Sequence, residues 1–512
     1  MLWIALHLPL LSLESFAATL PPGPSGQPLA LSDAHHIVSA NAAARALGVK
    51  RGLKRATALA LAPQLTLGQA NEARDEAALT AVAHAALAFT PGVVVLPASG
   101  AAGAPPPHTV LLDVQGSLRY FGGLVSLLQR LHETLAPLAH TLHTSSAPTA
   151  LGAALLARVH RDLHCADLAA MQATLDAAPV WLLGPGREHW EALQGMGLRT
   201  LADLRCLPRS GLARRFGPAL LSDLDRAYGD RPDPQQPITL APSFESRLEL
   251  FARADTTEQV LFGAGVLLAR LVLWLSAQHA FVRRFRLVMQ HEPRWRSSTE
   301  TPSATHLDVA LAEPSRDPAH LLVLLRERLA QLELPAPTLE LRLQADDIVR
   351  RPPPNSELFP TARSENEGLT RLIERLQARL GAAQVQRLAP VADHRPERAT
   401  QMLAQAACAR VTAARALAQQ ASVNPAVPVR PVWLLSQPEP LRERASGPLL
   451  DGQPLQLLSG PERIESGWWD AALAERDYYI AQLADGALVW IYRARLPLSA
   501  PAQGWFLQGR FG

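Results

Sequence analysis

Residues 108–122 read HTVLLDVQGSLRYFG, a stretch that joins an apolar run to a glycine turn. The run Thr109–Val114 has the length and the β-branched, apolar content of a buried strand, and Gly116 supplies the turn after it. Helical periodicity follows over Leu124–Leu135 and also precedes the run over Ala70–Phe89. Outward from this stretch, helices and strands alternate over the first 165 residues, which indicates an α/β or α+β domain. The other strands expected there are Leu2–Leu8, His36–Ala40 and Val93–Pro97.

The remainder of the chain changes its pattern three times. Only short helices are expected between Pro179 and Pro234, whereas Phe244–Ala345 gives strand and helix signals in alternation. A proline-rich linker starts near Arg350, and most of the tryptophans and tyrosines lie beyond residue 430, where we expect a small β-rich domain. The predicted parts are residues 1–165, 166–237, 238–348, 349–430 and 431–512.

Bulk properties limit the possible classes of protein. A chain of 512 residues is expected to form three or four domains, and its net charge of +3, carried mostly by arginine, fits nucleic-acid binding only weakly. The cysteines Cys165, Cys206 and Cys408 show neither metal-ligand spacing nor a disulfide framework, as is normal for a cytosolic protein. The most apolar segment, Val260–Ser276, is interrupted by Arg270, so we expect a buried helix and no membrane span.

A helix–hairpin–helix pattern occupies the helical part. The turn Leu183-Gly184-Pro185-Gly186 precedes Gly197-Leu198-Arg199-Thr200-Leu201, and a second tight turn follows at Gly217. Glycine lets backbone N–H groups approach a phosphate, because no side chain keeps the phosphate away. The alternative is an ordinary helical hairpin closed by a glycine turn. The predicted DNA-binding residues are Gly184, Gly186, Arg187, Arg199, Arg214, Arg215 and Gly217.

The order of these pieces resembles the Y-family (translesion) DNA polymerases over residues 2–345. His36–Val49, which ends in an A-R-x-x-G-V pattern, resembles their fingers motif, and Leu112–Gly122 resembles their palm motif. Gly184–Pro208 is similar to their thumb, and Phe244–Ala345 to their little finger. The resemblance implies an α+β multidomain fold with palm and fingers, a helix–hairpin–helix thumb, an α/β little finger and, here, an added β-rich C-terminal domain.

The resemblance also implies where catalytic carboxylates belong. Nucleotidyl transfer uses two magnesium ions, which bind hard oxygen ligands. With Glu14 and Asp113 as anchors, the expected acids are replaced by Ala5, His7, His108 and Thr109. The fingers tyrosine is replaced by Ala42, although Arg45 remains, and Asp113 is not a metal ligand in the family. We therefore expect no polymerase activity, no bound metal and no cofactor; His7 and His108 alone lack the third ligand of a softer metal site.

The C-terminal region extends the resemblance to the ImuB family, the catalytically inactive Y-family-like subunits of the bacterial mutasome. The matching segments are His394–Glu397, Arg430–Leu435, Leu457–Asp470, Arg476–Tyr479 and Trp505–Gly512. This resemblance implies a cytoplasmic, nucleoid-associated protein of translesion synthesis and SOS mutagenesis. Its implied partners are DNA without sequence preference, the sliding clamp, an error-prone C-family DNA polymerase and a RecA-like accessory protein.

Two segments are candidates for partner binding. Asn355-Ser356-Glu357-Leu358-Phe359 lies in the proline-rich linker, where Asn355, Leu358 and Phe359 are predicted to bind the clamp, although clamp peptides normally carry glutamine in place of Asn355. The alternative is an ordinary linker with two apolar residues. Trp468-Trp469 and Tyr478-Tyr479 either anchor a partner or fill the core of the C-terminal domain.

Three functions remain open from the sequence. The first is a non-catalytic scaffold that holds primer–template DNA and joins the clamp to an active polymerase. The second is an active translesion polymerase with displaced metal ligands, and the third is a DNA-binding protein without a mutasome role.

Overall fold

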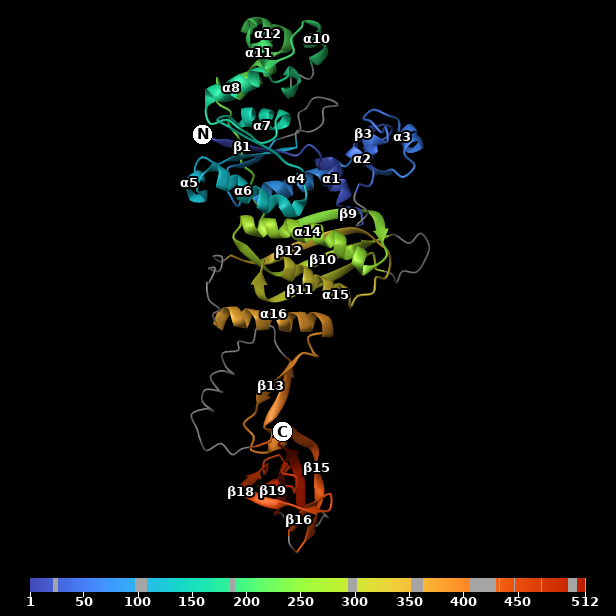
Figure 1. Ribbon diagram of the computed structural model, residues 1–512, viewed down its shortest axis with the longest axis vertical. Helices are drawn as coiled ribbons and strands as arrows, with labels where there is room; N and C mark the ends of the chain where they lie inside the picture. The colour runs from blue at the N-terminus through green and yellow to red at the C-terminus, as the bar shows by residue number, and fades with distance from the viewer. Residues whose placement is uncertain are drawn as a thin grey trace. The chain divides into compact units, whose positions relative to one another are not determined.

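The computed structural model describes residues 1–21, 26–96, 108–184, 189–292, 302–350, 362–404, 430–431, 433–445, 447–470, 472–495 and 504–511 (Figure 1). The chain divides into two compact units, Met1–Arg379 and Leu380–Gly512. The predicted α+β multidomain class is confirmed, and the β-rich C-terminal domain is present.

The palm-like part is a five-stranded sheet in the order β5-β6-β1-β7-β8, with β1 antiparallel to both of its neighbours. Alternate residues of β1 enter different cores: Ile4 and Leu6 pack with helices α4 and α6, whereas Trp3 and Ala5 pack with α7. The elements are β1 (Trp3–His7), α1 (Leu11–Ala17), α4 (Glu72–Ala86), β5 (Val93–Val95), β6 (Thr109–Asp113), α5 (Leu118–Phe121), α6 (Leu124–Leu135), β7 (His143–Ala147), α7 (Ala150–Val159) and β8 (Leu163–His164).

The fingers-like part is a small sheet, β3-β2-β4, with two short helices and a core of mainly alanine, valine and isoleucine. Asn41 starts the first helix, because its side chain accepts the Ala44 N–H at 2.8 Å. The elements are β2 (Leu29–Ser32), β3 (Ile37–Ala40), α2 (Ala42–Ala46), α3 (Arg55–Leu61) and β4 (Thr66–Gln69).

The thumb-like part is helical, as predicted, and its apolar residues continue the core on the α7 side of the palm-like sheet. Leu193, Leu201, Leu204, Leu212 and Phe216 are all buried there. The helices are α8 (Leu168–Asp176), α10 (Trp190–Gly195), α11 (Leu201–Arg205), α12 (Arg209–Phe216) and α13 (Pro218–Tyr228).

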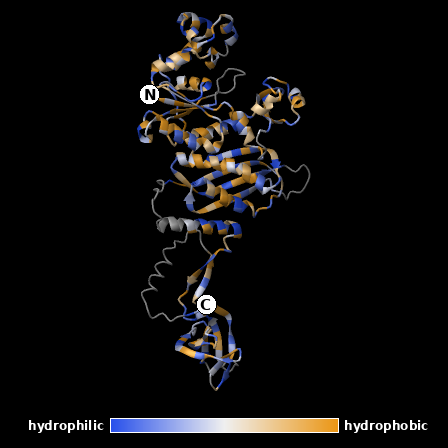
Figure 2. Ribbon diagram, in the orientation of Figure 1, coloured by the Kyte–Doolittle hydropathy of each residue, from blue (hydrophilic) through white to orange (hydrophobic). Residues whose placement is uncertain are grey.

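The little-finger-like part is a four-stranded antiparallel sheet, β11-β10-β12-β9, whose core it shares with two helices. Figure 2 shows hydrophilic and hydrophobic residues alternating along its strands, as expected for a sheet with one covered face. The elements are β9 (Phe244–Ala254), α14 (Thr257–Ala277), β10 (Ala280–His291), β11 (Ala304–Ser315), α15 (Pro318–Leu329) and β12 (Thr338–Arg350).

Helix α14 is, by length and composition, long and apolar enough to cross a membrane. Its apolar side is occupied within the protein, where Leu267, Leu271 and Trp274 pack in the core of the little-finger-like sheet. Arg270 is buried on the same helix and donates to Ser246 Oγ at 3.1 Å. Burial lowers the pKa of Arg270 to about 10. Packing against the sheet accounts for the apolar character of this helix.

Helix α16 (Ala362–Leu380) begins inside the range predicted as a linker and packs on the little-finger-like part. The buried Glu374 carboxylate accepts the backbone N–H groups of Ala312 and Glu313 and lies 2.8 Å from His320 Nε2. Ala378 is part of the same core. The residues up to Arg379 therefore belong to the first compact unit, and the five predicted part boundaries stay predictions.

The second unit holds a two-stranded ribbon and a seven-stranded sheet in the order β17-β16-β15-β21-β20-β19-β18. The loop of the ribbon is fixed by Arg395, a buried guanidinium that binds the carboxylates of Asp393 and Asp470 at 2.7 Å each. The strands are β13 (Gln386–Pro390), β14 (Thr400–Ala404), β15 (Trp433–Arg444), β16 (Gly447–Leu450), β17 (Gln453–Pro454), β18 (Gln456–Ser466), β19 (Ala474–Gln482), β20 (Leu488–Ala494) and β21 (Trp505–Arg510).

Candidate nucleic-acid interface

The residues predicted at the catalytic positions meet at one end of the palm-like sheet. Strand register places His7 opposite Thr109 on β6 and opposite His143 on β7, so the three side chains form a row across the sheet. His7 Nδ1 and Thr109 Oγ1 are 3.1 Å apart, and the rings of His7 and His143 are 6.1 Å apart. Ala5 lies in the next row, fully buried, opposite Leu111. The two sequence motifs thus converge on one site, as the resemblance implies.

His108 stands immediately before this row. Its backbone has a φ of +37°, a left-handed conformation, and its carbonyl accepts the Leu8 N–H at 2.9 Å. Burial lowers the pKa of His108, and burial also lowers that of His143, so both imidazoles favour the neutral form. Neutral imidazoles, a hydroxyl and a methyl group do not offer the hard anionic oxygens that magnesium prefers. Within the described part of the chain, no three His, Cys, Asp or Glu side chains gather as a metal site.

The two anchor acids of this region have structural roles. Glu14 accepts the backbone N–H of Thr141 at 3.0 Å and its hydroxyl at 2.6 Å, which ties α1 to the segment before β7. Burial would raise the pKa of Glu14, but the neighbouring His140 and the hydrogen bonds from Thr141 outweigh it, so the pKa is lowered. Asp113 accepts the Gln115 N–H at 3.3 Å and shapes the turn after β6.

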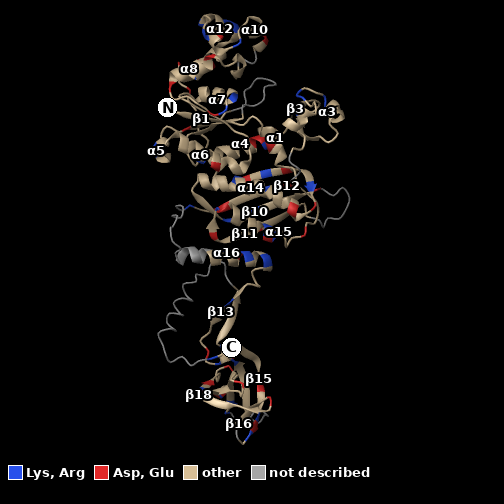
Figure 3. Cartoon of the chain, in the orientation of Figure 1, with Lys and Arg blue, Asp and Glu red and all other residues tan. Residues whose placement is uncertain are grey.

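The thumb-like helices place three of the predicted DNA-binding arginines at the surface. Arg199 precedes α11, whose first turn is closed by a capping box between Thr200 and Asp203. Arg214 and Arg215 are exposed in the last turn of α12. None of the three arginines forms an ion pair with a described residue. Figure 3 shows the basic residues on α12.

The glycines of this region meet the predictions only in part. Gly217 joins α12 to α13 with a φ of +81°, a conformation that favours glycine. Gly184 is partly buried and ends a described stretch. Gly186 and Arg187 lie outside the described residues, so the first predicted phosphate turn has no observed geometry. Gly197, between α10 and α11, has a φ of +83° and also makes a tight turn.

Other arginines of the thumb-like helices are engaged by the protein itself. Arg205 pairs with Asp176 at 3.3 Å, and its guanidinium lies 4.0 Å from the centre of the Tyr228 ring. Arg209 pairs with the buried Asp225 at 2.6 Å. These residues stabilise the helices, whereas the predicted residues Arg199, Arg214 and Arg215 are exposed and available for DNA contact.

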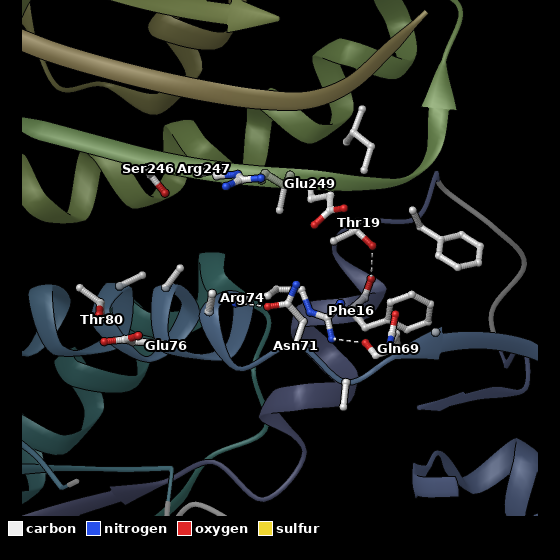
Figure 4. Close-up of a pocket in the computed structure, with 18 of the residues that line it drawn as sticks. Phe16, Thr19, Gln69, Asn71, Arg74, Glu76, Thr80, Ser246, Arg247 and Glu249 are labelled. Atoms are coloured by element: carbon white, nitrogen blue, oxygen red, sulfur yellow. Dashed lines mark hydrogen bonds between the residues drawn. The ribbon is translucent and has the colours of Figure 1, made fainter. Parts of the chain in front are cut away.

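A groove of about 850 Å³, which the sequence did not reveal, runs between α4, β4 and β9 in the first unit (Figure 4). Arg74 of α4 lies over the Phe16 ring at 5.4 Å and donates to Gln69 O at 3.2 Å. Glu249 of β9 faces it from the other wall (Figure 4). The lining combines Arg55, Arg74, Arg247 and Arg270 with Asp33, Glu76, Glu245 and Glu249. No single charge sign dominates, so the groove by itself does not indicate an anion.

The partner-binding predictions have different outcomes. Asn355, Leu358 and Phe359 lie outside the described residues. In the C-terminal domain, Tyr478 is buried and its ring is stacked 4.1 Å from that of Trp490, so it belongs to the core. Trp468 and Trp469 are 78% and 56% exposed and belong to the surface.

Known proteins similar to this chain include two curated relatives and several solved polymerase structures. No protein-family model matches the chain. Two curated relatives, each named Protein ImuB and from two strains of Caulobacter vibrioides, are 29% identical over 501 residues, which covers 91% of this chain and all of theirs. Among solved structures, an insertion ternary complex of Dbh DNA polymerase and DinB from Sulfolobus solfataricus are each 18% identical, with TM-scores of 0.38 and 0.37. Each covers 69% of this chain over its own full length.

Proposed function

Because the chain is a distant member of the ImuB family, we propose that it acts in DNA damage tolerance as a polymerase-shaped scaffold without nucleotidyl-transfer activity. The observation that carries this proposal is the row of Thr109, His7 and His143 across three strands, with Ala5 behind it. Two-metal catalysis needs anionic oxygens at these positions, and Ala5 has no ligand atom at all.

The scaffold holds primer–template DNA through sequence-independent contacts. Exposed Arg199, Arg214 and Arg215 on tight helical turns are suited to phosphate oxygens, which carry no sequence information. We expect binding to weaken steeply with salt and to vary little with base sequence.

The remaining roles in this proposal are those of assembly. The segment with Asn355, Leu358 and Phe359 binds the sliding clamp, and the C-terminal domain recruits an error-prone C-family polymerase and a RecA-like accessory protein. The exposed pair Trp468 and Trp469 supplies an anchor of the kind that interfaces use. The protein then works in the cytoplasm, at the nucleoid.

A primer-extension assay beside a clamp pull-down tests both parts. The purified chain is incubated with primer–template, deoxynucleotides and Mg²⁺ or Mn²⁺, and the expected result is no extended primer. Extension that also survives Asp113→Asn would establish the alternative, an active polymerase with displaced ligands. In the pull-down, Leu358→Ala with Phe359→Ala abolishes clamp capture. Failure of the unmodified chain to capture clamp or polymerase would favour a plain DNA-binding protein.

A further inference from the structure

The fingers-like part carries an unusual distribution of charge. Between Asp33 and Glu72 the sequence contains no acidic residue but five cations, Arg45, Lys50, Arg51, Lys54 and Arg55. All five are exposed, and none forms an ion pair with a described residue. Figure 3 shows basic residues near β3 and α3. A small body with so uniform a charge attracts polyanions.

Four of the basic and imidazole side chains line one hollow, which we call the fingers hollow. It has a volume of about 590 Å³ and is lined by Ala34, His35, His36, Lys54, Arg55, Ala56 and Leu59. No carboxylate lines it. Its volume lies in the range of small-molecule and nucleotide sites and is too small for a duplex.

Backbone hydrogen bonds hold the walls of the hollow together. His36 and Lys54 form an antiparallel bridge, and the Arg55 N–H donates to His35 O at 2.9 Å. The exposed carboxylate of Asp33, just before the hollow in sequence, accepts the N–H groups of His35 and His36 at 2.8 and 2.7 Å. These hydrogen bonds lower the pKa of Asp33 and fix the turn that presents both imidazoles.

We propose that the fingers hollow binds the phosphodiester backbone of single-stranded nucleic acid. Lys54 and Arg55 supply cations, and the exposed rings of His35 and His36 supply hydrogen-bond donors and flat faces on which an unpaired base can stack. The proposal rests on the DNA-binding role proposed above but concerns a different element from the thumb-like helices. It assigns the hollow to the unpaired strand beyond a primer–template junction.

Because the chain contains very few lysines, protection of the fingers hollow by DNA can be measured directly. Lys50 and Lys54 are the only two lysines in the 512-residue sequence, so a chain of this sequence has three reactive amines when its N-terminal amine is counted. Acetylation with an activated ester, read by mass spectrometry, therefore reports separately on two amines in the fingers-like part and one outside it. The assay runs without DNA, with blunt duplex, with a 5′-overhang primer–template, with deoxynucleotide, with inorganic phosphate and with poly-glutamate.

The expected result is slower acetylation of Lys54, and more weakly of Lys50, with overhang DNA but not with blunt duplex, while the N-terminal amine is unchanged. Lys54→Gln with Arg55→Gln is expected to weaken overhang binding about tenfold and to reduce the salt slope by about 1.4, or ~0.7 for each lost phosphate contact. Arg119→Gln with Arg130→Gln, which also removes two exposed charges, on α5 and α6, serves as the matched control.

The outcomes separate this inference from the proposed function. If overhang DNA binds without protecting Lys54, the proposal for the fingers hollow is wrong, whereas the scaffold proposal is unaffected. Equal protection by deoxynucleotide or phosphate assigns the hollow to a free small molecule, and equal protection by poly-glutamate assigns it to an acidic protein; either overturns the single-strand proposal. Absence of binding to any DNA contradicts the proposed function itself.

Discussion

His7 on β1 lies directly opposite Thr109 on β6, and the two side chains are 3.1 Å apart, at positions that the sequence resemblance to Y-family polymerases assigns to catalytic carboxylates. A histidine–threonine contact therefore links these two neighbouring strands. The site is therefore a packed and hydrogen-bonded part of the sheet. Introducing an acidic side chain there should lower the free energy of unfolding.

Ala5→Asp is expected to destabilise the first unit by about 3 kcal/mol at pH 7, because Ala5 is fully buried and no cation lies in its row. Burial raises the pKa of such a carboxyl in the folded state above its unfolded value. The loss therefore grows from about pH 4, the ordinary pKa of Asp, and is complete above the folded-state pKa. Thermal unfolding between pH 5 and pH 8 measures it.

Ala5→Asn is the matched control, since it adds the same volume without a titrating group, and its loss of stability is expected not to change with pH. If Mg²⁺ restored the stability of the Asp variant, the site would be a metal site with one missing ligand. That result would contradict the scaffold proposal.

Glu14→Gln is expected to cost about 2 kcal/mol of unfolding free energy at pH 7, because it removes a charge-assisted pair of hydrogen bonds to Thr141. The folded-state pKa of Glu14 is lowered, so its stabilisation is present above the unfolded pKa and is lost as pH falls through the folded pKa. The difference between variant and parent should vanish in acid. Glu133→Gln on the exposed face of α6 should change stability by less than about 0.5 kcal/mol at every pH.

The sequence allowed the palm-like part to be predicted well where patterns were long. Helix α6 has the predicted bounds Leu124–Leu135, and β6 follows Thr109–Val114 to within one residue. The short strands β2, of sequence LALS, and β4, of sequence TLGQ, were missed, because four residues are too few to show alternation. Their pairing is set by tertiary contacts with each other and with β3.

The site was predictable in its composition but not in its surroundings. The resemblance to Y-family polymerases pointed to Ala5, His7, His108 and Thr109, whereas His143 joins the row only because β7 pairs with β1. The groove beside Arg74 draws its walls from α4, β4 and β9, which are far apart in sequence. Attachment of α16 depends on Glu374, a residue that looks like any solvent-exposed helical glutamate until its burial is known.

Glu374→Ala is expected to detach α16 from the little-finger-like part and to cost about 3 kcal/mol, since it leaves backbone N–H groups and His320 without their buried acceptor. Hydrogen exchange of the amides in α16 should accelerate. Arg375→Ala removes only an exposed ion pair with Glu327 and should cost less than about 0.5 kcal/mol. Equal protection of α16 in both variants would mean that its apolar contacts alone hold it.

Trp468→Ala separates the two uses of aromatic residues in the C-terminal domain. Its ring is 78% exposed, so the change should alter stability by less than about 0.5 kcal/mol and yet reduce capture of the partner polymerase in a pull-down. Trp490→Ala, in contrast, removes a buried ring stacked on Tyr478 and should cost about 4 kcal/mol. Undiminished capture by the Trp468 variant would place the partner surface elsewhere on the domain.

Arg214→Gln with Arg215→Gln tests the thumb-like contact with duplex DNA. Both side chains are exposed and without an ion pair in the described part of the chain, so the double variant should keep its stability. If each guanidinium neutralises one phosphate, the slope of log affinity against log salt should fall by about 1.8, or ~0.9 per contact on duplex DNA. The loss should be the same for unrelated DNA sequences, because phosphate contacts do not read bases. Fluorescence anisotropy with two blunt duplexes over a salt series measures both quantities, with Arg119→Gln plus Arg130→Gln as the control for a simple loss of two charges. A loss confined to one sequence would mean that these arginines contact base edges, and an unchanged salt slope would remove α12 from the interface.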